Sequence, residues 1–144
     1  MNFACRLSVL LLLVALTAQS TSVSAQIPIF IKSFADERIE VGTPTRMVFT
    51  IDHQLGLIDA NDVGFTDTFP TGLEPANPSN FTTSCNGGSG FNSTEFNYQG
   101  TILAGELCTL ELDMVGITPG LKDNITGDLT SSLGNSGPAR AIVI

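Results

Sequence analysis

Residues 63–78, VGFTDTFPTGLEPANP, decide the fold of this chain. In the first half, apolar residues and one aspartate alternate with small or polar residues, a period of two that indicates a β-strand with one buried face. The inward set is Val63, Phe65, Asp67 and Phe69. The second half, from Pro70 onward, contains three prolines and a glycine, which cannot continue a hydrogen-bonded ladder. The stretch therefore predicts a strand that runs into a rigid surface loop.

Asp67 occupies an unusual place in this strand, because it shares the inward face with Phe65 and Phe69. Burying a carboxylate costs several kcal/mol unless the group is hydrogen-bonded. Residues 70–72 follow at once and offer backbone N–H groups and a hydroxyl. We expect Asp67 to accept hydrogen bonds from this turn and to fasten the strand to the loop, which is a structural role.

Two other runs alternate as cleanly, at residues 45–52 and 107–115. The side chains predicted to face the core are Met47, Phe49 and Ile51 in the first run, and Cys108, Leu110, Leu112 and Met114 in the second. Weaker signals predict strands at residues 27–34, 81–85, 91–98, 125–133 and 139–144, with a glycine-rich turn at 86–90.

Two of these weaker segments carry specific expectations. Residues 27–34 are apolar on both parities, which fits a buried strand or one that changes sheets. In residues 125–133, Ile125, Leu129 and Leu133 are expected on one face. A loop at residues 53–61 is expected to tuck its three apolar side chains under the edge of the sheet; they are Leu55, Leu57 and Ile58.

The chain thus holds seven or eight short predicted strands, separated by Gly, Pro and Asn turn signals and by no convincing amphipathic helix. Such a chain must bury one face of each sheet against another, so we expect an all-β sandwich of antiparallel strands. A closed β-barrel is the alternative architecture.

The first 25 residues have the features of a secretory signal peptide. Arg6 supplies the positive segment, residues 7–15 the apolar segment, and residues 23–25 (Val-Ser-Ala) a small-residue cleavage site. A membrane anchor is the alternative, but the apolar segment is shorter than the roughly 20 residues that span a bilayer. We expect cleavage after Ala25, a single domain at residues 26–144 without a transmembrane span, and a secreted or cell-surface location.

The charge of the chain restricts its partners. It carries 14 Asp and Glu against 6 Lys and Arg, a formal net charge of −8. A surface this acidic is repelled by nucleic acids and anionic membranes, so neither is an expected partner.

Three motifs together resemble the bacterial surface families of unknown function called DUF11 and DUF7933. They are FTDTFPTGL at residues 65–73, SCNGG at 84–88 and AGELC at 104–108, and the resemblance covers essentially all of residues 26–144. It implies an immunoglobulin-like sandwich that serves as a structural or adhesive module without catalysis. The implied partners are an unknown protein or envelope component, and possible neighbouring β-sandwich domains.

Cys85 and Cys108 are the only cysteines after the predicted signal peptide. An even number of cysteines in an exported chain predicts a disulfide between them. A two-thiol metal site is the alternative, but it lacks further ligands because His53 is the only histidine. No cofactor is expected.

The chain shows no recognisable catalytic machinery. GxSxG and HExxH motifs are missing from the sequence, and a lone histidine such as His53 in a loop is usually solvated. Glu111 and Asp113 share the outward face of one strand and are expected to form an exposed acidic face. We therefore predict that the protein is not an enzyme. Of three hypotheses about its function, a secreted hydrolase has the least support.

The second hypothesis, after a structural or adhesive module, is an extracellular module that binds calcium or carbohydrate. Asp59 and Asp62, with Asp52 as a further candidate, are weak calcium ligands, and the segment fails the EF-hand pattern at two positions. Turn formation by Asp is the alternative. Carbohydrate modules stack sugars on exposed aromatic rings, yet the chain has no Trp and one tyrosine, Tyr98. The N-glycosylation acceptor pattern occurs at Asn80, Asn92 and Asn124, and it matters only in a eukaryotic host.

Overall fold

The computed structural model describes residues 25–144, so the predicted signal peptide lies outside the described residues except for Ala25. This part of the chain folds into twelve strands in three antiparallel sheets, without a helix. The predicted all-β sandwich is confirmed. Four strands are only two or three residues long, which is why the count exceeds the seven or eight predicted from alternation. No helix within residues 25–144 is long and apolar enough to cross a membrane.

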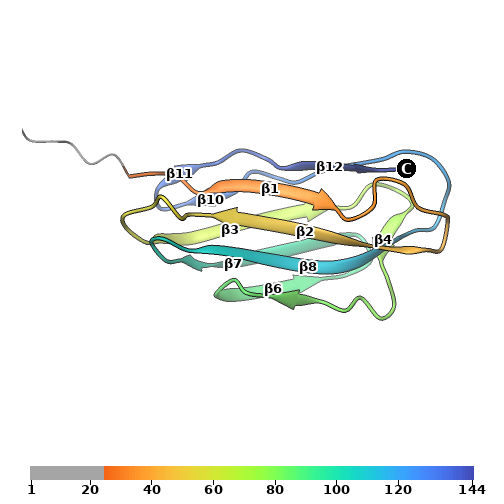
Figure 1. Cartoon of the computed structure of the whole chain (residues 1–144), viewed down its shortest axis with the longest axis horizontal. Helices are drawn as coiled ribbons and strands as arrows, with labels where there is room; N and C mark the ends of the chain where they lie inside the picture. Colours follow the sequence, from red (N-terminus) through yellow and green to blue (C-terminus); the bar gives the residue numbers. More distant parts are fainter. Residues whose placement is uncertain (1–24) are drawn as a thin grey trace, which may run out of the picture.

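The first sheet is built around the longest antiparallel pair of the molecule (Figure 1). Its strands, in spatial order, are β1 (Ile29–Phe34), β2 (Pro44–Asp52), β8 (Leu107–Gly116) and β4 (Leu73–Pro75), and β5 (Thr82–Thr83) also pairs with β8. β2 and β8 stay in register from Pro44 opposite Val115 to Asp52 opposite Leu107.

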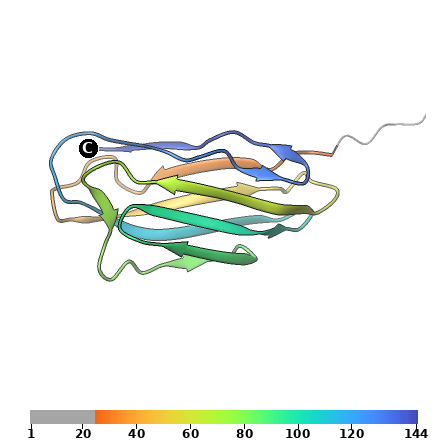
Figure 2. The ribbon, with the colours of Figure 1, turned by 180° about the vertical axis from the view of Figure 1, so that it is seen from behind.

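The second sheet contains the strand from which the sequence argument started. Its order is β11 (Gly134–Asn135), β10 (Thr130–Ser131), β3 (Ala60–Thr68), β7 (Glu95–Ile102) and β6 (Gly87–Phe91). β3 pairs with β7, with a shift of register between Ala60 and Val63 where Asp62 adopts a positive φ of 53°. Figure 2 shows the molecule from the opposite side, where this second sheet lies in front of the first.

A third, two-stranded sheet closes one side of the sandwich. It pairs β9 (Lys122–Ile125) with β12 (Arg140–Val143). β12 contacts β1 of the first sheet, and β9 contacts β3 of the second (Figure 1). This small sheet therefore bridges the two large ones.

Aromatic rings occupy the centre of the core. Phe49 and Phe96 are fully buried, with their ring centroids 5.0 Å apart, and the Phe65 ring lies 4.9 Å from that of Phe49. The inward faces predicted for β2, β3 and β8 are confirmed, since all the residues named for them are buried. Contacts of this kind contribute about 0.5–1.5 kcal/mol per ring pair beyond the area they bury.

The first strand differs from its expectation as a buried strand. In β1, Lys32 and Phe34 face the core, while Ile29 and Ile31 are half exposed. β1 stays in the first sheet and does not change sheets, and the exposure of Ile29 and Ile31 places them on its outer face.

Three of the weaker predictions were wrong: the turn at residues 86–90, the strand at 91–98 and the strand at 125–133. Residues 86–90 do not form a turn: Gly87–Phe91 is strand β6, and the turn lies at residues 92–94, where the Asn92 side chain accepts from the backbone N–H groups of Thr94 and Glu95. Residues 125–133 are not one strand, because β9 ends at Ile125 and β10 begins at Thr130. In between, the backbone N–H of Gly127 donates to the carbonyl of Thr66.

Candidate functional site

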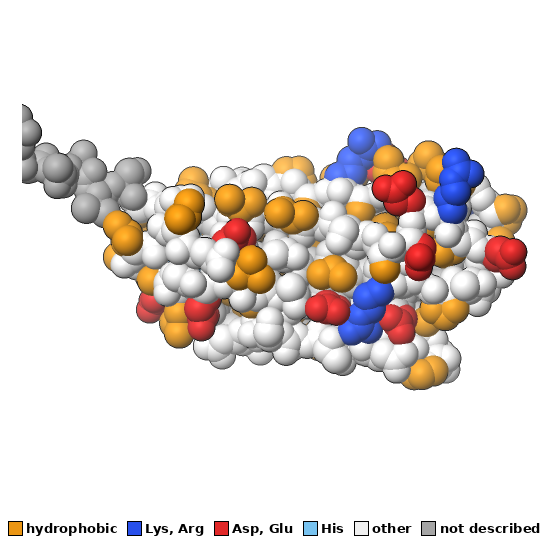
Figure 3. All heavy atoms as spheres, in the orientation of Figure 1, with side chains coloured by type: hydrophobic (Ala, Val, Ile, Leu, Met, Phe, Trp, Pro, Cys, Tyr) orange, Lys and Arg blue, Asp and Glu red, His pale blue; other side chains and the backbone are white. Residues whose placement is uncertain are grey.

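The most distinctive surface of the molecule is an apolar end formed by two neighbouring loops. Five large apolar side chains are exposed there: Leu55 (71%), Leu57 (70%), Ile58 (53%), Leu103 (42%) and Leu107 (46%). In Figure 3, where this end lies on the left, hydrophobic side chains are visible there as well as elsewhere on the same face. The prediction that the first three tuck under the sheet was wrong. We refer to these five residues as the apolar end.

His53 holds the two loops of the apolar end together. The ring is buried, and its Nε2 lies 2.8 Å from the carbonyl oxygen of Ile58, to which it donates. The backbone carbonyl of His53 accepts from the N–H groups of Gly56 and Gly105, and its N–H donates to the carbonyl of Glu106. The expectation of a solvated loop histidine was therefore wrong.

Two further contacts fix the shape of this surface. At Gly56 a Cβ atom would overlap the His53 ring, so the loop requires glycine there. The Asp59 carboxylate accepts from the backbone N–H of Ala104 at 2.9 Å and ties the first loop to the second. The outward direction of the leucines follows from a backbone that is hydrogen-bonded on its inner side.

The weak calcium candidates, Asp59 and Asp62, do not converge on a common point with a third ligand. Asp59 is hydrogen-bonded to Ala104, and Asp62 sits at the bulge of β3. Asp52 accepts from the backbone N–H of Gln54, as in an Asx turn. Throughout residues 25–144, no group of three or more His, Cys, Asp or Glu side chains is placed to hold a metal ion.

The predicted disulfide between Cys85 and Cys108 is present and closes a separation of 23 residues. Cys85 lies where the chain passes from β5 in the first sheet to β6 in the second, and Cys108 lies on β8. The bond therefore connects the sheets on the side of the sandwich opposite to the small third sheet.

A buried polar cluster lies on the side of the third sheet. As alternation predicted, Asp67 faces inward, and it is fully buried. Its partners are not the expected groups of residues 70–72: the Lys32 Nζ donates to Oδ2 at 2.6 Å, and the Asn124 Nδ2 donates to the same oxygen at 3.1 Å. Lys32, Asp67 and Asn124 come from β1, β3 and β9, so one carboxylate joins three sheets.

The cluster is buried and incompletely hydrogen-bonded. Burial lowers the pKa of the Lys32 amine to about 8, although the Asp67 carboxylate opposes this change. The amine also lies 5.2 Å from the centre of the Phe49 ring. The second oxygen of Asp67 and the Oδ1 of Asn124 are buried without a hydrogen-bond partner among the described residues. Sequence reasoning missed Lys32 and Asn124, although Lys32 has the parity of Phe30 and Phe34.

The acidic face predicted on β8 is engaged by one arginine. Arg46 on β2 donates to Glu111 at 3.3 Å and to Asp113 at 3.0 Å. A hydrogen bond from the Asn80 side chain, together with Arg46, holds the pKa of Asp113 below its usual value. These contacts connect β2, β8 and the segment before β5, so the acidic pair has a structural use.

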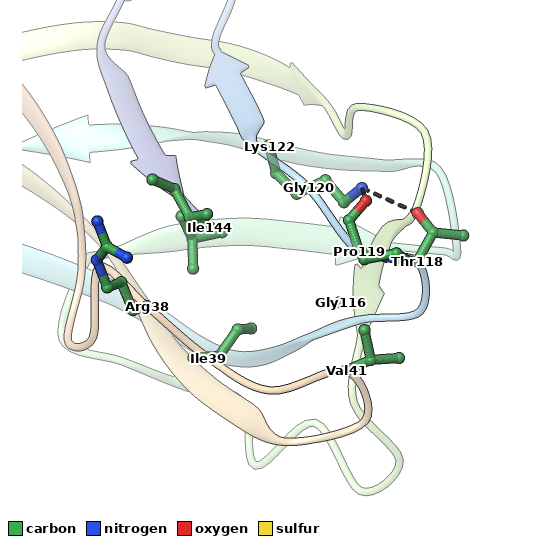
Figure 4. A pocket seen from close by; sticks show the side chains of 10 residues that line it. Arg38, Ile39, Val41, Gly116, Thr118, Pro119, Gly120, Lys122 and Ile144 are labelled. Carbon is green, nitrogen blue, oxygen red and sulfur yellow. Dashed lines mark hydrogen bonds between the residues drawn. The ribbon is translucent and has the colours of Figure 1, made fainter.

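Two of the hollows on the described surface lie away from the apolar end. A wide groove crosses the outer face of the second sheet, with Gly64, Gly88 and Gly90 among its lining residues. A smaller cavity of about 320 Å³ lies toward the other end of the sandwich. Figure 4 shows Ile39 and Ile144 in it, and Lys122 on its far side bonded to Thr118.

The architecture defines a class, the antiparallel β-sandwich with an immunoglobulin-like arrangement of sheets and a disulfide between them. Residues 28–144 match the family described as "Domain of unknown function (DUF7933)", and the chain belongs to this family. The expected likeness to DUF11 remains a prediction. A comparison with curated protein sequences finds no match.

Three similar solved structures share the fold. A cohesin module from a Clostridium perfringens ATCC13124 family 33 glycoside hydrolase has a TM-score of 0.56 at 7% identity and covers 81% of this chain and 96% of its own. The bacterial hydrophobin BslA has a TM-score of 0.53 at 14% identity, with coverages of 83% and 93%. The collagen adhesin CNA from S. aureus has a TM-score of 0.53 at 12% identity, with coverages of 86% and 49%. At these identities the likeness shows the fold alone.

Proposed function

We propose that this protein is an extracellular structural or adhesive module, without catalysis, that contacts its partner through the apolar end. The observation that carries this proposal is the construction of that end: a buried histidine and a required glycine hold two loops so that five large apolar side chains point outward. Contiguous exposed apolar side chains of this kind mark interaction sites in soluble proteins.

Burial of the apolar end would contribute favourable free energy to binding. Burying a leucine or isoleucine side chain fully contributes about 1.5–3 kcal/mol. The five side chains of the apolar end would together offset a large part of the loss of translational and rotational freedom on association. The loops are already ordered by hydrogen bonds, so little further entropy is lost on binding.

The comparisons support the class of function. The structures with the same fold include, by their titles, a cohesin module, a collagen adhesin and a hydrophobin. The predicted signal peptide supports export. A carbohydrate-binding module has less support, because Tyr98 is buried and Phe91 is the only aromatic side chain among residues 25–144 that is more than about a third exposed.

The test compares two double variants, each of which removes two exposed apolar side chains, from different surfaces. Leu55→Ser with Leu57→Ser changes the apolar end, and Ile29→Ser with Ile31→Ser changes the outer face of β1. We expect at least a tenfold loss of retention on intact cells and isolated envelopes of the encoding organism for the first variant alone. Wild-type retention of the first variant would contradict the proposal.

The apolar end also favours a second candidate function, assembly at an interface between water and an apolar phase. The two most exposed large apolar side chains of the described residues, Leu55 and Leu57, lie together at this end, and one similar structure is a hydrophobin by its title. The same variants test it: surface pressure at an air–water interface should fall for the leucine variant and not for the isoleucine variant. Equal surface pressures would remove this candidate.

A further inference from the structure

The buried cluster brings an amine and a primary amide together on one carboxylate oxygen. Lys32 Nζ and Asn124 Nδ2 both donate to Asp67 Oδ2, at 2.6 and 3.1 Å. All three side chains are buried, and they come from strands of three different sheets. An ion pair needs only the Lys32 amine and the Asp67 carboxylate. It does not explain why a buried primary amide also lies against the same oxygen.

We propose that Lys32 and Asn124 react with each other to form an intramolecular amide bond, with Asp67 transferring the protons and ammonia leaving. The reaction is a transfer of the Asn124 acyl group from one nitrogen to another. It needs no oxidant, reductant or added reagent, because every atom of the product and of the leaving group comes from the three side chains.

The protons balance through Asp67. The carboxylate first takes a proton from the Lys32 ammonium, which leaves a neutral amine whose nitrogen attacks the side-chain carbonyl carbon of Asn124. Asp67 then delivers this proton to Nδ2, the carbon–Nδ2 bond breaks, and ammonia departs. The second proton that Nζ loses passes to Asp67, so the cluster ends as a neutral carboxylic acid beside a neutral amide.

The surroundings favour each of these steps. An amine must be neutral to act as a nucleophile, and burial lowers the pKa of Lys32 to about 8. Water, which would compete for the acyl carbon and would solvate the ions, is excluded by the sandwich core. The unreacted cluster also leaves Asp67 Oδ1 and Asn124 Oδ1 without donors, and a protonated Asp67 supplies one.

Lys122 provides a natural internal control. It is also a buried lysine and lies on β9, two residues before Asn124. Its Nζ donates to the Thr118 hydroxyl at 2.9 Å and to the carbonyl of Pro119 at 3.5 Å, and to no carboxylate of residues 25–144. Lys122 therefore lacks the proton acceptor that the reaction requires.

The deciding experiment is a tryptic digest of the folded wild-type protein after reduction and alkylation, analysed by tandem mass spectrometry. Cleavage after Lys and Arg releases residues 123–140, which contain Asn124, separately from the fragment that ends at Arg38 and contains Lys32. We expect these two segments as one branched fragment, lighter than their sum by one ammonia and uncut after Lys32. The disulfide cannot imitate this link, because both cysteines lie within residues 47–122.

The branched fragment is required as the readout, because the intact mass alone is ambiguous. Cyclisation of Gln26 at a new N-terminus, or succinimide formation at Asn86-Gly87, also releases ammonia. Neither joins distant segments. Wild-type protein that melts cooperatively and yields both segments separately, cut after Lys32, would overturn the proposal.

Variants assign the roles. Lys32→Met and Asn124→Ala should abolish the branched fragment, and Lys122→Arg, which keeps the tryptic site, should yield it as the wild type does. Asp67→Asn keeps the size of the side chain but cannot take up a proton, so it should leave the segments separate in protein whose folding is verified by its disulfide and its circular dichroism. A branched fragment formed by this variant at the wild-type rate would overturn the role of Asp67.

Discussion

Asp67 illustrates how much of this fold depends on one buried carboxylate. It is fully buried and receives hydrogen bonds from two strands that lie far from it in sequence. Asp67→Asn leaves the Lys32 ammonium in the core without a counter-charge, which costs about 3–5 kcal/mol in comparable buried pairs. We expect a large fall in the free energy of unfolding, measured by urea denaturation.

The matched control for this prediction is Asp62→Asn. Asp62 is exposed and has a positive φ, a conformation that Asn tolerates well. It should unfold like the wild type. If Asp67→Asn also unfolded at the wild-type urea concentration, the cluster would not contribute to stability.

Gly56 is the residue on which the shape of the apolar end depends. A Cβ there would overlap the buried His53 ring, whose hydrogen bond to Ile58 fixes its position. We expect Gly56→Ala to lower the melting temperature and to increase amide hydrogen exchange in residues 53–58. Gly88→Ala, where a Cβ meets open space, should change neither quantity. Equal effects of the two substitutions would show that the loop has room to adapt.

Predictions for single residues were correct where they concerned only which face of a strand a side chain occupies. The inward direction of Asp67 and Cys108 followed from alternation. The burial of His53 did not, because it depends on how two loops fold around the ring, and the partners of Asp67 did not, because they come from other sheets. Lys32 is a similar case. It has the same parity as the buried Phe34, but its neighbour Ile31 is more apolar, so the sequence did not indicate that Lys32 is buried and Ile31 exposed.

Among the elements, the passage from β5 to β6 depends on the disulfide. Both flanking strands are short or rich in glycine and bury little apolar surface. In the loop-entropy model, closing 23 residues contributes about 3 kcal/mol. We expect the double variant Cys85→Ala with Cys108→Ala to melt several degrees below the wild type in a thermal scan, while reducing agent should not lower its melting temperature further. An unchanged melting temperature would mean that the core alone holds this edge.

Strands were predicted correctly where large apolar side chains alternate with polar ones, and were missed where glycines predominate. β2, β3 and β8 alternate large apolar with polar residues, and their inward faces were predicted correctly. β6, with the sequence GGSGF, has almost no side chains to alternate, and its strand conformation comes from pairing with β7. A strand defined by its neighbour rather than by its own residues leaves no local signal.

At the scale of the whole molecule, the two large sheets are connected on both sides of the sandwich, and the five residues of the apolar end lie exposed at one end. The disulfide joins the sheets on one side, and the Lys32–Asp67–Asn124 cluster joins them on the other. The class of fold was predictable because alternation commits most apolar residues to a core. The apolar end was not, because exposed leucines in a loop look like buried ones until the histidine beneath them is placed.

The most direct test of the proposed function is hydroxyl-radical footprinting of the protein free and bound to isolated envelopes of the encoding organism. Leucine side chains are oxidised in proportion to their exposure, and Leu55 and Leu57 are the most exposed of the large apolar residues described. We predict a severalfold drop in the oxidation of both on binding, with Ile31 on β1 unchanged as the internal control. Bound protein in which Leu55 and Leu57 are oxidised as fast as in free protein would contradict the account.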